Sequence, residues 1–144
     1  MKRIGKIIIA AIFSVAAAAP SFAGDLTVTL TDVQAQKGDL YVSLQKQGEF
    51  MQPRGSYGAI IKAPKSGEQK VTLKDVAPGD YSIAVWHDSD ADGKFSQAAN
   101  GIPLDGWTMV NAQNLRGVPT WDQVKFVVPS DNVATTLMMI YPRK

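Results

Sequence analysis

The chain has 144 residues, no cysteine and one histidine, and its 15 basic and 13 acidic residues give a net charge of +2. The lack of cysteine excludes disulfides, thiol catalysis and thiolate metal sites, and one imidazole does not support a zinc or copper site of histidines within one chain. No basic stripe is present, so the chain gives no electrostatic footprint for nucleic acid.

The first 23 residues predict a cleaved secretory signal peptide. A positively charged start is followed by an apolar run over 7–19 and by small residues at 21–23. The run is shorter than the roughly 20 residues of a membrane span. Cleavage removes three of the 15 basic residues, which leaves 12 against 13 acidic ones. We therefore expect a mature chain, 24–144, that is periplasmic or secreted, has no membrane span and forms a single domain.

Period-two alternation of apolar residues recurs along the mature chain and predicts half-buried β-strands. The alternating segments, in chain order, are 26–30, 40–44, 57–62, 71–73, 81–85, 124–128 and 133–141. Turns rich in glycine and proline lie between several of them, and no long stretch has an amphipathic helical pattern. About seven strands at roughly ten-residue spacing predict an all-β fold, an antiparallel two-sheet sandwich with Greek-key connections.

Residues 88–122 interrupt this pattern with little alternation and with six glycines and prolines. Long irregular loops are uncommon in compact domains and are often functional. This one contains an acidic cluster and two of the three tryptophans. We therefore expect the functional site of the β-sandwich domain to lie in this loop.

The acidic cluster is Asp88-Ser-Asp-Ala-Asp-Gly-Lys-Phe95, with carboxylates at alternate positions and a glycine after the third. This spacing is typical of the front half of a calcium loop, in which the glycine permits a sharp turn. The predicted metal ligands are the carboxylates of Asp88, Asp90 and Asp92, the backbone carbonyl of Lys94, and the hydroxyl of Ser96 or a water that it holds.

The back half of the loop departs from that pattern. Ala99 stands at position twelve, where a bidentate carboxylate usually completes the coordination, and Asn100 or Asp105 could replace it by a different loop path. We expect weak, structural calcium binding, with a dissociation constant of about 10⁻⁴–10⁻³ M. The other interpretation is a solvated turn in which each aspartate caps a neighbouring amide.

Three further side chains are candidates for a binding surface: His87, Trp107 and Trp121. His87 could act as a base with Asp88 or Asp105, although strand neighbours point to opposite faces, which favours a buried structural histidine. The tryptophans could stack against a sugar ring or a peptide, or could turn inward and cap the sandwich.

Several short motifs occur in order along the chain. They are Ala77-Pro-Gly-Asp-Tyr81, Ala84-Val-Trp-His-Asp88, Asp92-Gly-Lys94, Asn100-Gly-Ile-Pro103, Gly106-Trp107 and Asn111. Together they resemble an exported bacterial family catalogued as domain of unknown function 2141. The resemblance implies a transthyretin-like or immunoglobulin-like sandwich and no particular activity. Family members commonly carry an acidic residue where this chain has Ser96, which implies weaker ion binding here.

These observations predict an exported, non-enzymatic β-sandwich module whose calcium-stabilised loop shapes a binding surface for an extracytoplasmic glycan, peptide or protein. Two alternatives stay open. One is a small hydrolase or isomerase that uses His87 with a neighbouring carboxylate. The other is a purely structural domain in which the acidic loop is only a turn.

Overall fold

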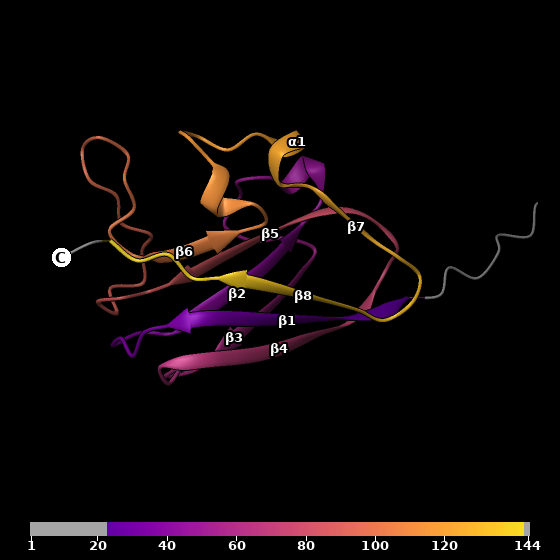
Figure 1. The fold of residues 1–144 in the computed structure, drawn as a ribbon, viewed down its shortest axis with the longest axis horizontal. Helices are drawn as coiled ribbons and strands as arrows, with labels where there is room; N and C mark the ends of the chain where they lie inside the picture. The colour runs from indigo at the N-terminus through magenta and orange to yellow at the C-terminus, as the bar shows by residue number, and fades with distance from the viewer. Residues whose placement is uncertain (1–22, 143–144) are drawn as a thin grey trace, which may run out of the picture.

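A computed structural model of the protein describes residues 23–142, which form a two-sheet β-sandwich (Figure 1). The strands are β1 (Gly24–Val33), β2 (Leu40–Gln45), β3 (Tyr57–Ile61), β4 (Gly67–Val76), β5 (Gly79–His87), β6 (Gly106–Met109), β7 (Phe126–Val128) and β8 (Val133–Met138). The helices are short: η1 (Gln47–Glu49), η2 (Ala112–Asn114) and α1 (Trp121–Val124). The predicted signal peptide, 1–23, lies outside the described residues apart from Ala23. Within 23–142, no helix has the length and apolar character needed to cross a membrane.

One sheet has the strand order β4-β1-β8, and the other has the order β3-β2-β5-β6, with β7 also paired to β5. The predicted all-β, two-sheet sandwich is confirmed, and seven of the eight strands fall on predicted segments. Two details differ. β8 runs parallel to β1, so the sheets are not wholly antiparallel. The one strand that falls on no predicted segment is β6, which lies within 88–122, the range predicted to be an irregular loop.

The apolar alternation that predicts the other strands does not reveal β6, because the side chain of β6 that faces inward is polar. Thr108 is buried and pairs with Val85 of the core, whereas Trp107 and Met109 project to the opposite face. That outer face is covered by a second apolar cluster, so apolar residues are favourable on both sides of the strand. The alternation of a half-buried strand is therefore reversed at β6.

The main core lies between the sheets, where alternate residues of the strands meet. Its fully buried members include Leu26, Val28, Leu30, Leu40, Leu44, Ile83 and Val76. The second cluster, on the outer face of the five-stranded sheet, consists of Met109, Ala112 and Val124 with Phe50, Trp107, Leu115 and Ile140 packed against it. Figure 1 shows α1 on this outer side, beyond β5. The five-stranded sheet is therefore covered on both faces along β5 and β6, whereas Ile60 of β3, on the same outer face, is exposed.

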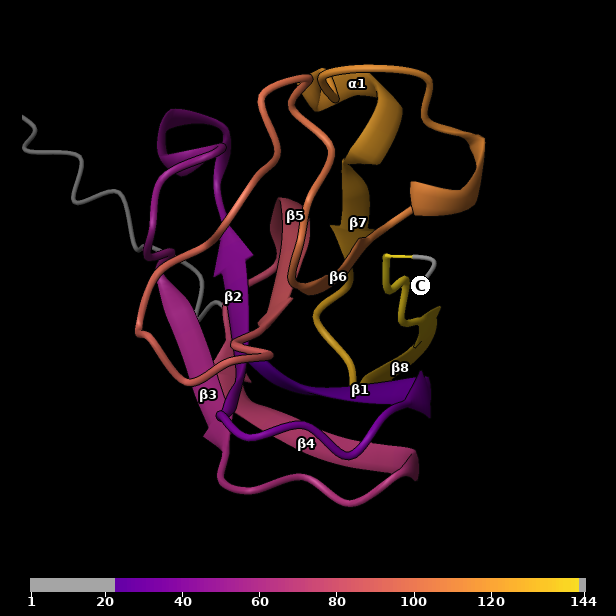
Figure 2. The same cartoon turned by 90° about the vertical axis from the view of Figure 1, so that its left-hand side faces the viewer.

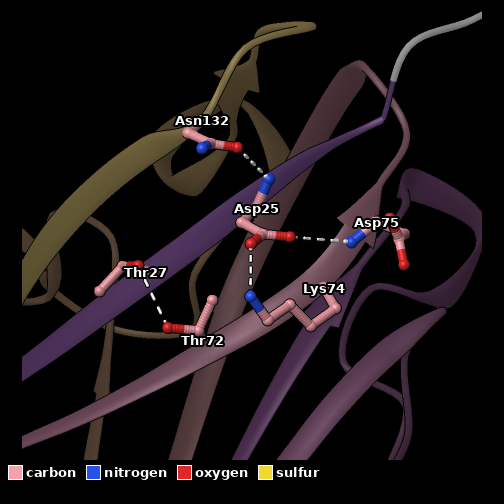
Figure 3. Close-up of polar contacts among 6 residues, drawn as sticks. All are labelled: Asp25, Thr27, Thr72, Lys74, Asp75 and Asn132. Atoms are coloured by element: carbon pink, nitrogen blue, oxygen red, sulfur yellow. Dashed lines mark hydrogen bonds and ion pairs between the residues drawn. The ribbon is translucent and has the colours of Figure 1, made fainter.

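The first residues of β1 are tied to both neighbouring segments (Figure 3). Asp25 donates its backbone N–H to the side-chain oxygen of Asn132 at 2.8 Å, and its carboxylate accepts from Lys74 Nζ at 2.6 Å. The same carboxylate accepts the backbone N–H of Asp75 at 3.3 Å. The hydrogen bond from Lys74 is the main cause that lowers the pKa of Asp25. These contacts hold β1 between β4 and the turn before β8.

Two tyrosines close the turn that leads into β5. The buried Tyr81 donates its hydroxyl to the carbonyl of Ala77 at 2.9 Å, and the N–H of Ala77 donates to the hydroxyl of Tyr57 at 3.0 Å. A tyrosine that bonds to backbone a few residues upstream is also a feature of immunoglobulin-type sandwiches. Burial, followed by the contact with Tyr57, raises the pKa of Tyr81 to about 12.

Replacing Tyr81 by phenylalanine is expected to destabilise the domain by about 1–3 kcal/mol, because the Ala77 carbonyl loses its partner. The loss should shrink at high pH. A phenol whose pKa rises from 10.0 to about 12 on folding stabilises the folded state fully below pH 10.0, and that contribution disappears as pH approaches 12. Denaturant unfolding of both proteins from neutral pH upward measures the difference. If the free energy of unfolding depended on pH in the same way in both proteins, the raised pKa of Tyr81 would be contradicted.

Candidate metal centre

The end of β5 is held against the segment that precedes β2. The N–H of Asp88 donates to the carbonyl of Asp39 at 3.0 Å, which continues the β2–β5 pairing beyond His87. Gly38 packs directly on Asp88, and a Cβ at this glycine would lie 2.2 Å from the Asp88 carbonyl oxygen. The close approach requires glycine at this position and fixes the main chain from which the Asp88 side chain projects.

The pairing of β5 with β6 brings two distant aspartates together. His87 pairs with Gly106, so Asp88 and Asp105, the next residues outward, face each other at the mouth of the loop between the strands. Carboxylate oxygens of Asp88, Asp90 and Asp105 all lie within 4.8 Å of one another. Asp88 is 4% exposed and Asp105 is 2% exposed, whereas Asp90 is open to solvent.

No ion pair among the described residues includes these three carboxylates; the lysines that do form ion pairs there join other acids. Like charges repel more strongly in a buried environment than in water, because the surroundings screen them less. Hard oxygen donors gathered in this way suit calcium or another hard cation. Asp88, Asp90 and Asp105 are therefore the residues that could hold such a cation.

Asp105 closes the loop through three hydrogen bonds. Its Oδ1 accepts the N–H of Ser89 at 3.0 Å. Its Oδ2 accepts the N–H of Ser96 at 3.0 Å and the indole N–H of Trp86 at 3.2 Å. Hydrogen bonds to an ionised acceptor are stronger than neutral ones. One carboxylate thus joins the end of β5, the middle of the loop and the start of β6.

The loop also wraps around the carboxylate of Asp88. Its two oxygens accept the N–H groups of Asp92 at 3.1 Å and Gly93 at 3.0 Å. Gly93 has a φ of +75°, the left-handed conformation in which glycine carries no steric penalty. A carboxylate has about four lone-pair positions, so both oxygens retain capacity for a further partner.

The structure brings together two of the predicted ligands, Asp88 and Asp90, and adds Asp105. Asp92 is not among the three, and its carboxylate accepts the N–H of Lys94 at 2.8 Å. The backbone of Ser96 donates to Asp105. Ligand roles for Asp92, the Lys94 carbonyl and the Ser96 hydroxyl stay predictions. As a metal ligand, Asp105 is predicted from the sequence only as a substitute for the position-twelve carboxylate, because the local motif does not reveal the β5–β6 pairing.

His87 lies behind the acidic group and is 0% exposed. Its Nδ1 is 2.7 Å from the hydroxyl of Tyr141, and that hydroxyl accepts the backbone N–H of Gln34 at 3.1 Å. Burial lowers the pKa of His87, against the opposing effects of the Gly38 backbone and the Asp105 charge, so the neutral ring is favoured. An imidazole enclosed in this way does not reach a substrate in solvent, so the hydrolase alternative lacks an accessible base.

Aromatic side chains adjoin the acidic group on the outer face of the sheet. Trp86 stacks on Tyr41 with ring centroids 4.7 Å apart, and Phe95 meets Trp86 edge to face at 6.3 Å. Trp107, beside Trp86 in the β5–β6 register, is half-buried. Trp121 is also half-buried and lies edge to face with Phe50 at 5.8 Å. Each of the two tryptophans thus offers only part of its ring to solvent.

Comparison with known proteins identifies the family but gives no activity. No curated protein and no solved structure matches the chain. The family model described as uncharacterized protein conserved in bacteria (DUF2141) matches residues 28–136, which run from β1 to β8 and include the whole acidic loop. The chain therefore belongs to this bacterial family, domain of unknown function 2141.

Proposed function

We propose that the protein is an exported, non-enzymatic β-sandwich module in which the loop over 88–105 binds calcium and holds a surface for an extracytoplasmic glycan, peptide or protein. The observation that carries the proposal is the convergence of Asp88, Asp90 and Asp105. Export to the periplasm or the exterior rests on the charged, apolar and small-residue order of the first 23 residues.

Calcium suits this set of donors better than other common ions. It takes six to eight hard oxygens in flexible geometry, so three carboxylates can be completed by main-chain carbonyls and water. Magnesium requires a nearly ideal octahedron, and zinc prefers nitrogen or sulfur ligands, which the group does not supply. With three carboxylates we expect a dissociation constant of about 10⁻⁴–10⁻³ M, as in extracellular modules.

The surface that such an ion would hold is the tip of the same loop. Residues 96–104 form a small hairpin, with the N–H of Leu104 donating to the carbonyl of Ser96 at 2.8 Å and a bridge between Gln97 and Pro103. Figure 1 shows this segment projecting from one end of the sandwich. Ile102 and Leu104 are exposed on the hairpin, and Phe95 at its base. A cation bound at Asp105 would therefore fix the orientation of exposed apolar side chains.

The structural alternative is supported by a different observation. The carboxylates of Asp88 and Asp105 already accept five N–H groups between them, and such bonds close a loop without an ion. The calcium-binding module and the purely structural domain differ in one property: only in the first does the stability of the loop depend on calcium.

Replacing Asp90 by alanine distinguishes the calcium-binding module from the purely structural domain. Asp90 is exposed, and its carboxylate makes only a 3.3 Å bond to the N–H of Asp92, so the variant should melt like the parent in chelator. In calcium at about ten times its dissociation constant the parent should gain about 1.4 kcal/mol, a shift of a few degrees, and the variant should gain little. Asp131→Ala, at the exposed turn before β8, is the matched control. Equal losses in calcium and in chelator would eliminate the ion site.

Terbium luminescence locates the ion. Because the Trp86 indole donates to Asp105, a terbium ion in the site would lie close enough to be sensitised by excitation of that tryptophan. We expect terbium emission that calcium displaces, that is largely lost in Trp86→Phe and that is retained in Trp121→Phe. Emission that survives in Trp86→Phe, or that calcium does not displace, would place the ion elsewhere.

A further inference from the structure

The two edges of the three-stranded sheet are chemically different. β4 and β8 are its outer strands. β4 carries Glu68, Lys70 and Lys74, and its pairing with β1 is broken by register shifts. Charges and bulges of this kind are how proteins protect an edge from pairing with another chain. β8, with the sequence VATTLM, has no charged residue and no proline. β8 is therefore the unprotected edge of this sheet.

The main chain of β8 has unused pairing capacity on one side. β8 is paired only to β1, and within residues 23–142 no other strand joins it. Just beyond the strand, the N–H of Met139 donates to the carbonyl of Thr31 at 3.0 Å. Because parallel neighbours bond through alternate residues, the N–H and C=O groups of Ala134, Thr136 and Met138 point away from β1.

A groove runs beside this free edge. After β8 the chain crosses to the other sheet, where Ile140 and Trp107 exchange two backbone hydrogen bonds of 2.8 and 2.9 Å. On the β8 side of that bridge the two sheets stay apart (Figure 2). The space between them has a volume of about 200 Å³. Its lining includes Asn111, Gln113 and Asn114 at η2 on one wall, and Thr136 and Met138 of β8 on the other.

We propose that this groove binds an extended peptide segment of a partner protein, which adds to β8 as a further strand. The free main-chain groups of β8 match an extended backbone, and the amides of Asn111, Gln113 and Asn114 supply polar groups on the opposite wall. A helix bonds its own backbone N–H and C=O groups internally, so it offers no main-chain partners to a strand edge. This site is separate from the acidic loop and does not depend on calcium.

The test uses random dodecapeptides displayed on phage and selected on the folded protein. The decisive variant is Thr136→Pro, which removes an N–H that points away from β1 beside the groove and that makes no bond to β1. Thr136→Ala, which keeps that N–H, is the control. Selected peptides should bind the parent and the alanine variant alike, should bind the proline variant at least tenfold more weakly, and should slow hydrogen exchange at Ala134, Thr136 and Met138.

A second measurement tests the proposal even if the Thr136→Pro variant does not fold. Methylation of alternate backbone nitrogens of a selected peptide removes its strand hydrogen bonds and should abolish binding in one of the two alternating patterns. The proposal fails if no peptide is enriched on the parent, if both methylated forms bind normally, or if exchange at β8 is unchanged. It also fails if sedimentation shows the parent as a dimer that Thr136→Pro dissociates, since the occupant would then be a second copy of the chain.

Discussion

The positions of both sheets and of the acidic loop depend on the register of β5. This strand pairs with β2, β6 and β7, and its alternate residues Tyr81, Ile83 and Val85 fill the core. Because side chains alternate with a period of two, a slip of one residue would exchange these with Ser82, Ala84 and Trp86. The same slip would turn the end of the strand and separate the aspartates that now meet beyond it. Burial of the core therefore specifies the geometry of the site.

The site is a consequence of hairpin geometry at the end of that strand. Pairing of His87 with Gly106 places Asp88 opposite Asp105, and the polar backbone of the intervening loop is satisfied by those two carboxylates. The buried carboxylates of Asp88 and Asp105 are stabilised by N–H groups of the loop. Together with the exposed Asp90 they still concentrate negative charge, because the three carboxylates lie within 4.8 Å of one another. A hard cation would neutralise it and would stiffen the hairpin that stands above.

The sequence predicts most of the strands and about half of the candidate metal site. What it predicts depends on local patterns of residues along the chain. Alternation in β1, β2 and β5 is visible because one face of each is apolar and the other is more polar. β6 is hidden, because Thr108 faces the core and Trp107 the second cluster. Spacing within 88–93 reveals Asp88 and Asp90, which lie in one turn. Asp105 joins them through strand pairing, which no local spacing encodes.

Calorimetric titration of metal-free residues 24–144 with calcium measures directly whether the acidic loop binds an ion. We expect saturable binding of one ion per chain, with a dissociation constant of about 10⁻⁴–10⁻³ M. The absence of saturable heat at millimolar calcium would contradict it, and the acidic loop would then be a turn closed by its own carboxylates.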